Sequence, residues 1–323
     1  MAKPILISGI QSDGRLHLGN YLGAIKNFVE LQNSNKYDCY FFIADYHSLT
    51  VDFNPEEKKN QVYDVVKAYL AAGIDPKKST IFIQSHVPES TELAWVFNTL
   101  MPVGELERMT QFKDKMENKK SVNTGLLTYP LLMAADILIY NAKFVPVGDD
   151  QLQHLELTRS TARKFNSKFG ETFIEPEAVL TKASRVMSLN DPEKKMSKSR
   201  PITCLFLDDS EKDIEKKIKR SVTDSGSEVK YNLKNKAGLS NLLSIYEALS
   251  EKSIKEIEEK YKGKGYGDFK SDLISLVAEK LKPFREFKTG EEKLNEIIRA
   301  GDIKAKKMAS KKMREIKDKI GLI

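Results

Sequence analysis

Hydrophobic positions in the first 186 residues alternate between short apolar runs and longer stretches with helical spacing. The apolar runs cover residues 4–10, 40–44, 80–84 and 144–147 and predict four strands. Between them, apolar residues recur every three or four positions, as at Leu18, Leu22 and Ile25, which predicts helices. Because strands that alternate with helices pair in parallel, the pattern predicts an α/β fold with a Rossmann-like parallel sheet covered on both faces.

The best-marked helix start is Asn54-Pro55, between the second and third predicted strands. Asn54 can cap the helix, Pro55 fits its first position, and Glu57 can complete a capping box. Gly73 is expected to end this helix. Further helices are expected over residues 94–101 and 126–140, and from Gly148 toward residue 165.

The pattern changes after Val186. A polar stretch flanked by Pro192 and Pro201 predicts an exposed loop over residues 189–201. Beyond it the β-branched runs disappear, and apolar residues recur with helical spacing through Ile303. We therefore expect an α/β domain over residues 1–188 and a smaller all-helical C-terminal domain.

Composition agrees with two soluble domains. The chain has 323 residues, of which 40% are hydrophobic and 31% charged, which excludes a small module and global disorder. The net charge of +7 is unevenly placed: residues 1–204 carry 25 basic and 24 acidic groups, whereas residues 205–323 carry 28 and 22. The basic excess lies in the C-terminal third.

Cys39 and Cys204 are the two cysteines and lie far apart. They predict neither a disulfide framework nor a zinc site. The apolar stretch at the N-terminus is short for a signal peptide, and no apolar run approaches membrane-spanning length. We expect a cytoplasmic protein without a membrane segment.

A glycine-containing turn, residues 9–20, follows the first predicted strand. Gly9 and Gly19 would let a ligand approach the backbone, and His17 and Asn20 place hydrogen-bonding groups at the start of a helix. Ligands of parallel sheets bind outside the carboxyl ends of the strands. The turn therefore predicts a nucleotide site; a tight strand-to-helix connection with a solvated histidine is the alternative.

Residues 195–199, with the sequence Lys-Met-Ser-Lys-Ser, form a second candidate site on the predicted loop. Two lysines three positions apart can close on one anion, and such cations suit a pyrophosphate leaving group. A solvated surface turn is the alternative. The occurrence of both motifs in one chain, in this order, favours nucleotide chemistry.

The two motifs resemble those of class I aminoacyl-tRNA synthetases. Residues 17–20 are similar to the first motif of that family, and residues 195–199 match its second motif without change. Longer blocks extend the resemblance to the tryptophan-specific branch along almost the whole chain. These blocks are residues 9–21, 104–115, 125–142, 145–159, 194–199 and 262–270.

The resemblance implies an ATP site in which His17, Lys195 and Lys198 stabilise the transition state. The residues expected around ATP are Gln11, Ser12, Asp13, Gly19, Asn20, Lys115, Gly148, Asp149, Asp150, Val186, Lys195, Met196, Ser197, Lys198 and Ser199. A surface lysine at position 115, and capping charges or a metal pair at positions 149 and 150, are the alternatives. Mg2+ is expected to be carried mainly by the phosphates, with no metal site on the protein.

One segment departs from the family pattern. The family usually has Pro-Ser where this chain has Ser12-Asp13. A carboxylate that faces a triphosphate is repelled by it, so the side-chain role of Asp13 is an open question at this point.

Asp136 interrupts a long apolar run, and a buried carboxylate needs a partner. The sequence alone leaves a surface charge or an internal lysine pair open. The resemblance implies instead that Asp136 accepts the indole N–H of tryptophan, a ligand side chain with one donor and no acceptor. Tyr129, Met133 and Gln151 complete the implied tryptophan site, with core packing as the alternative for Tyr129 and Met133. Trp95 is expected in the core or at a subunit interface.

The resemblance implies a tryptophan–tRNA ligase with L-tryptophan, ATP and tRNA(Trp) as partners. Residues 202–300 would bind the anticodon, residues 301–323 would pack back on the catalytic domain, and two chains would form a homodimer. No DNA or membrane partner is expected. The alternatives are a tyrosyl-tRNA synthetase, which shares both motifs, and an inactive synthetase-like RNA-binding protein.

Overall fold

A five-stranded parallel sheet forms the centre of the N-terminal domain in the computed structural model, which describes residues 3–118, 122–180 and 186–323. Its strands are β1 (Ile5–Gln11), β2 (Asp38–Ala44), β3 (Ser79–Ile83), β4 (Phe144–Val147) and β5 (Glu177–Leu180). The four predicted strands are present within two residues of their expected ends. β5 was not predicted, because its four residues begin with a charged side chain and are only partly buried.

The strand order β3-β2-β1-β4-β5 places a topological switch point between β1 and β4. On one side the chain proceeds outward through β2 and β3, and on the other through β5. β1 and β4 pair at Leu6 and Phe144, close to the start of both strands. Their carboxyl ends are therefore the expected position of a ligand crevice.

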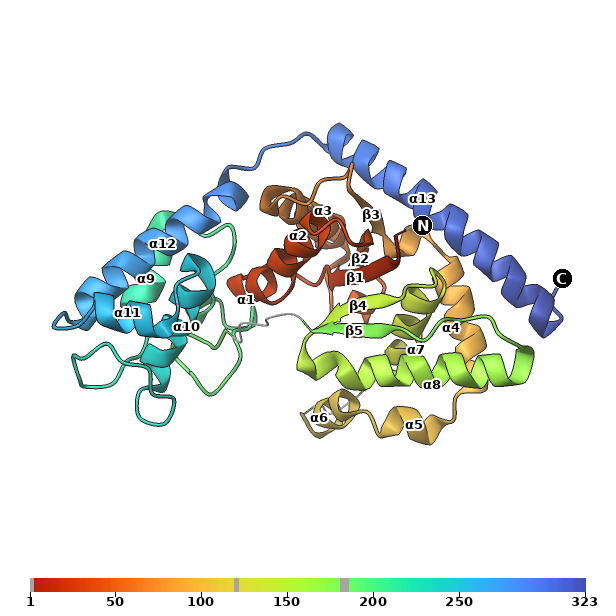
Figure 1. Cartoon of the computed structure of the whole chain (residues 1–323), viewed down its shortest axis with the longest axis horizontal. Helices are drawn as coiled ribbons and strands as arrows, with labels where there is room; N and C mark the ends of the chain where they lie inside the picture. The colour runs from red at the N-terminus through yellow and green to blue at the C-terminus, as the bar shows by residue number, and fades with distance from the viewer. Residues whose placement is uncertain (1–2, 119–121, 181–185) are drawn as a thin grey trace.

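Helices cover both faces of this sheet, as predicted (Figure 1). The helices of this domain are α1 (Leu18–Asn20), α2 (Lys26–Asn33), α3 (Pro55–Ala72), α4 (Glu89–Leu100), α5 (Val103–Glu107), α6 (Thr110–Asn118), α7 (Thr124–Leu138) and α8 (Leu152–Phe169). Of these, α5 and α6 lie beyond α8, away from the sheet (Figure 1). Successive residues of β2 point to opposite faces: Phe41 joins the apolar core under α2 and α3, and Phe42 the core under α4, α7 and α8.

Helix α3 begins and ends where the sequence indicates. Asn54 Oδ1 accepts a hydrogen bond from the Glu56 amide at 3.1 Å, and Gly73 adopts a left-handed conformation with φ of 103° at the end. The capping box expected at Glu57 is wrong in its detail. The Glu57 carboxylate accepts a hydrogen bond from the Asn54 side-chain amide at 3.3 Å, whereas in a capping box it would accept from the Asn54 backbone N–H.

The second domain is helical and lies beside α1 and α3 (Figure 1). It contains α9 (Glu211–Lys219), α10 (Ala237–Ser250), α11 (Ile254–Lys260) and α12 (Tyr266–Glu286). Its apolar core is continuous with the core under α2 and α3. Among the described residues, no helix is long and apolar enough to span a bilayer.

Helix α13 (Glu291–Ile320) leaves the helical domain and lies along β3 and α4 (Figure 1). Ala305, Ala309 and Met313 on its inner face are buried in the core under α4. Asp302 Oδ1 accepts from the Ile83 amide at 3.1 Å, and its Oδ2 lies 2.6 Å from His86 Nδ1. This hydrogen bond raises the pKa of His86.

Several lysines of α13 serve its docking. Lys304 pairs with Asp38 at 3.0 Å and Lys317 with Glu92 at 2.6 Å, while the buried Lys312 donates to the Thr172 carbonyl at 2.7 Å. Some of the basic residues at the C-terminal end of the chain therefore contact the first domain, and others on the same helix are exposed to solvent.

Gly301 permits this docking, since a Cβ atom there would lie 1.8 Å from the Ile81 carbonyl oxygen. Gly301→Ala is expected to lower the free energy of unfolding by about 2 kcal/mol or more, because the obstacle is backbone of the sheet and cannot rotate away. Urea unfolding followed by circular dichroism measures the change. Ala300→Ser, at an exposed neighbouring position, is the control. Equal stability of both variants and the parent would contradict the tight contact.

Candidate active site

A cavity of about 610 Å3 lies at the switch point, within the size range of ligand sites. Ser8 and Gly9 of β1 and Pro146 and Val147 of β4 form its floor. The other lining residues are His17, Gly19, Asn20, Gly23, Ala24, Phe28, Gly148, Asp149, Asp150, Gln151, Val186, Lys195 and Met196. The two sequence motifs, about 180 positions apart, thus line one cavity.

The first motif is fixed at the start of α1. Asn20 Oδ1 accepts from the His17 amide at 3.0 Å, and the Leu18 amide donates to the Leu205 carbonyl at 2.8 Å. Burial, and then the nearby charge of Lys198, lower the pKa of His17 to about 4 against the opposing effect of Asp13. His17 therefore contributes a neutral imidazole at physiological pH. A Cβ on Gly19 would lie 2.9 Å from the His17 ring, so a larger residue there would require the ring to shift.

The second motif is anchored at its methionine. Met196 is 5% exposed, and its amide donates to the Val186 carbonyl at 3.0 Å. Lys195 Nζ lies 3.6 Å from Asp150 Oδ2, and Lys198 forms an ion pair with Asp13. The sequence suggested two lysines on one anion. The structure gives each lysine its own carboxylate on the first domain.

Asp136 lies in α7 with only 2% of its surface exposed. Gln84 Nε2 donates to Asp136 Oδ2 at 2.7 Å, and His47 Nε2 lies 2.9 Å from the same oxygen. The Gln84 orientation is fixed because its Oε1 accepts from the Tyr46 amide at 3.1 Å. Both contacts end on Asp136 Oδ2.

A second cavity of about 270 Å3 surrounds this carboxylate. Tyr129, Met133 and Gln151, the other residues expected to bind tryptophan, line it together with Asp136. Gln151 also lines the larger cavity, so the two spaces adjoin. The Tyr129 hydroxyl donates to Gln111 Oε1 at 2.9 Å and lies 2.7 Å from His154 Nε2. Burial raises the pKa of Tyr129 to about 12, so its hydroxyl stays protonated.

Not all predicted ATP residues line a cavity: Ser12, Asp13, Ser197, Lys198 and Ser199 are not among the lining residues of the larger or the smaller cavity. Gln11, at the end of β1, lines the smaller cavity. Ser12 is fully buried, and the Ser197 and Ser199 hydroxyls lie 2.9 Å apart on the loop. Lys115 lies in α6, and its side chain is outside the described part of the structure.

Sequence reasoning missed Gln84 and Gln111, and it left His47 without a role. Gln84 begins the 3-10 turn η3 (Gln84–His86) directly after β3, and a polar residue at the carboxyl end of a predicted parallel strand is the signal that could have found it. Gln111 and His47 carry no comparable pattern, because they reach the cavity from a short helix and from the turn η2 (His47–Thr50).

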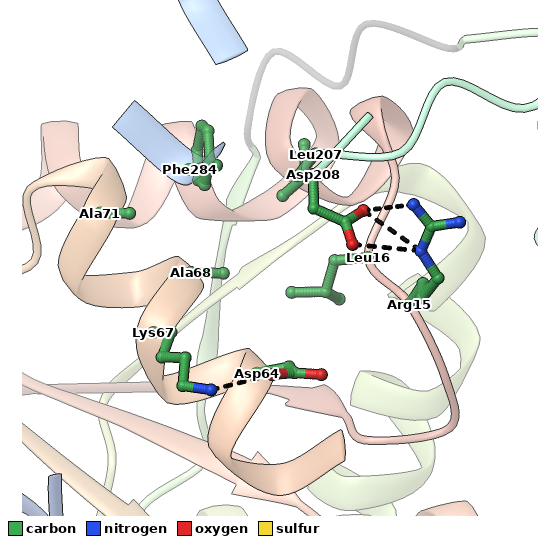
Figure 2. Close-up of a pocket in the computed structure, with 9 residues that line it drawn as sticks. All are labelled: Arg15, Leu16, Asp64, Lys67, Ala68, Ala71, Leu207, Asp208 and Phe284. Atoms are coloured by element: carbon green, nitrogen blue, oxygen red, sulfur yellow. Dashed lines mark hydrogen bonds and ion pairs between the residues drawn. The ribbon is translucent and has the colours of Figure 1, made fainter. Parts of the chain in front are cut away.

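A smaller pocket, of about 120 Å3, lies where the two domains meet. Figure 2 shows Arg15 and Asp208 pointing toward one another at its edge, with Lys67 and Asp64 on α3. The Arg15 guanidinium also lies 4.0 Å from the centre of the Phe206 ring. The pocket is too small for a nucleotide, and we interpret it as part of the domain junction.

Metal ligands do not cluster in the described residues: no group of three or more histidine, cysteine, aspartate or glutamate side chains could hold an ion. Asp149 and Asp150 lie in the turn η4 (Asp149–Gln151), and Asp150 faces Lys195. Asp150 Oδ2 lies 3.5 Å from Gln151 Nε2 and 3.6 Å from Lys195 Nζ.

The chain is similar to proteins of one family. The family model described as "tRNA synthetases class I (W and Y)" matches residues 1–282. The tryptophan–tRNA ligase of Bacillus anthracis is 50% identical over 98% of both chains. That of Bacillus subtilis is 48% identical over 99% of this chain and 98% of its own.

Solved structures show the same likeness. Tryptophanyl-tRNA synthetase from Mycoplasma pneumoniae superposes with a TM-score of 0.90 at 36% identity and covers 100% of this chain and 99% of its own. The Campylobacter jejuni synthetase, complexed with ADP and tryptophan, gives 0.82 at 39% identity over 98% and 99%. Tyrosyl-tRNA synthetase from Aeropyrum pernix, at 19% identity, shares the fold.

The contact between Gln84 and Asp136 predicts a specific defect in amino-acid binding. Gln84→Leu removes a donor from Asp136 and leaves the Tyr46 amide without its acceptor, so tryptophan binding should weaken about tenfold or more. Calorimetric titration with tryptophan measures this. Gln84→Glu keeps the shape but places a second carboxylate beside Asp136, and we expect a larger loss. Unchanged binding in both variants would show that Gln84 does not position Asp136.

Proposed function

The chain belongs to the class I tRNA synthetases of the tryptophan and tyrosine group, and from this premise we propose how its residues carry out the reaction. Its activity is that of a tryptophan–tRNA ligase, because relatives with this name are 48 and 50% identical to it along nearly the whole chain. The observation that supports the amino-acid site is the small cavity around Asp136, whose carboxylate would accept the indole N–H.

In the first step, the carboxylate of tryptophan attacks the α-phosphate of ATP in line. Tryptophanyl-adenylate forms and pyrophosphate leaves. ATP would occupy the larger cavity and tryptophan the smaller one, so that the reacting groups meet near Gln151, which lines both. Such a step needs little covalent help, since position and charge supply most of the acceleration.

The charged and polar groups of the two motifs would act on the phosphates. Lys195 and Lys198 would stabilise the charge that builds on pyrophosphate, and the neutral imidazole of His17 would donate or accept a hydrogen bond without adding a net charge. Asp149 and Asp150, in the turn before α8, line the larger cavity and would accept hydrogen bonds from the ribose hydroxyls. The backbone at Val186 would meet the adenine.

Mg2+ would be carried by the ATP phosphates. Mg2+ binds phosphate oxygens and keeps several waters, so the ion would arrive with its nucleotide. The chemistry that the ion supplies is neutralisation of phosphate charge.

In the second step, a hydroxyl of the terminal adenosine of tRNA attacks the adenylate. Membership of class I indicates the 2′-OH. The helical domain, residues 202–300, would contact the anticodon region, as the family resemblance implies. Its own net charge is only +1, from 20 basic and 19 acidic groups, and most of the C-terminal basic excess lies on residues 301–323, where it would favour contact with RNA phosphates. A cytoplasmic location suits this substrate, and Cys39 and Cys204 are buried free cysteines.

We expect tryptophan to support ATP–pyrophosphate exchange and tyrosine to support almost none, because the phenolic O–H of tyrosine lies farther from its Cα than the indole N–H of tryptophan and would not meet Asp136 in the same position. Equal exchange with tyrosine would overturn the assignment.

Lys195→Ala should lower the exchange rate roughly 100-fold while tryptophan binding changes little, since the lysine acts on the leaving group. Exchange kinetics measure the rate, and equilibrium titration measures tryptophan binding. Equal losses of rate and binding would show that Lys195 does not act in the transition state.

Two chains are expected to associate through α4. Trp95 on this helix is 70% exposed, so a core position is wrong for it. Its position at a subunit interface stays a prediction. A groove of about 450 Å3 near it is lined by Leu49, Thr91, Ala94, Asn98 and Leu132 among others. An exposed tryptophan beside a groove is typical of protein interfaces.

Light scattering after gel filtration tests this interface. The parent chain should have twice the mass of one 36.7 kDa chain, and Trp95→Glu should reduce the mass to that of one chain, because a charge would be buried between subunits. Trp95→Phe, which keeps an aromatic ring, is the control. A dimeric Trp95→Glu variant would place the interface elsewhere.

A further inference from the structure

The residue that departs from the family pattern, Asp13, contacts the second motif directly. Its carboxylate forms an ion pair with Lys198, which is 185 positions away along the chain. Both side chains are partly withdrawn from water, with 23% of Asp13 and 35% of Lys198 exposed. The turn after β1 is thereby joined to the loop by a charge pair with reduced solvent screening.

The turn is shaped to receive the lysine. Gly14 has a φ of 133°, a conformation that side chains rarely adopt, and a Cβ there would lie 3.3 Å from Lys198 Cδ. The aliphatic part of Lys198 can therefore lie across the turn. On the other side, Lys58 Nζ donates to the Ser12 carbonyl at 2.9 Å. Two ammonium groups thus flank this turn, and Asp13 is the anion between them.

The opposite end of the loop is held in a similar way, by Lys195 and Asp150 at 3.6 Å. With Met196 buried, the motif is fixed at three points over the larger cavity. Lys198 is the member whose partner is unusual, because Asp13 stands where the family usually has an uncharged serine. A negative group on this lysine is the chemical equivalent of a phosphate oxygen.

We infer that Asp13 is a positioning residue that takes, before ATP binds, the place on Lys198 that a phosphate oxygen takes afterwards. The inference rests on the proposed function of the cavity as an ATP site. ATP must displace the carboxylate, so Asp13 weakens nucleotide binding. In return it keeps the loop closed on the first domain when no nucleotide is present.

Asp13→Asn is the test, because it keeps the size of the side chain and removes its charge. We expect ATP, titrated with Mg2+ in a calorimeter, to bind about three- to tenfold more tightly. Asp13→Glu, which restores the charge, should bind like the parent. Asp208→Asn is the matched control. Asp208 pairs with Arg15, which lies two positions after Asp13, so this variant also removes one carboxylate from an ion pair of the same turn. It should leave ATP affinity unchanged.

A second measurement reports the loop itself. Limited trypsin digestion, read by mass spectrometry, should cleave after Lys198 several times faster in Asp13→Asn than in the parent when ATP is absent. Saturating ATP should protect both. In a Lys198→Met background, most of the gain in ATP affinity from Asp13→Asn should disappear, because the competition for the lysine no longer exists.

The outcomes separate this inference from the function on which it rests. If the parent protein binds no ATP, the proposed site fails. If it binds ATP but Asp13→Asn shows equal or weaker affinity, or an equal gain with Lys198→Met, Asp13 does not compete with phosphate. An equal gain in Asp208→Asn would assign the effect to general charge, which also overturns the role of Asp13.

Discussion

The separation of β1 from β4 is the constraint on which the site depends. The strands pair at Leu6 and Phe144 and then leave room between their carboxyl ends. Chain segments on both sides of this opening end in polar turns, because strand hydrogen bonding has stopped there. The larger cavity, the smaller cavity and the loop of residues 189–201 all lie at that opening, so the position of the proposed site follows from sheet topology.

The buried carboxylate of Asp136 sets a second requirement, which is a hydrogen-bond donor beside it. Asp136 lies in an apolar helix and must be satisfied, and Gln84 supplies a donor only because β3 ends at the preceding residue. The same turn is held from its other side by Asp302 of α13, which binds Ile83 and His86. The proposed amino-acid site is therefore supported by a helix that is not among the elements lining the smaller cavity. A rigid support of this kind keeps a donor within the narrow distance range that discrimination requires.

Much of the fold is present in the sequence because buried strands and amphipathic helices have distinct periods. Four strands and the ends of α3 follow from that pattern. β5 has too few apolar residues to be distinguished, and Gln84 and His47 gain meaning only when tertiary structure brings them to Asp136. The ion pair between Asp13 and Lys198 joins residues 185 positions apart, and no local pattern contains such information. Motif resemblance located the residues, and the structure supplied their partners.

The position of α13 also has a consequence during synthesis. β3 is an edge strand, and the helix that covers it contributes Asp302, 219 positions after Ile83. At a translation rate of about 5 to 20 residues per second, this edge stays uncovered for roughly 10 to 40 s after β3 has been made. An unpaired edge strand is a template for intermolecular pairing. The nascent chain therefore passes through an aggregation-prone interval that closes only when its terminal helix docks, and ribosome-associated chaperones would have their greatest effect in that interval.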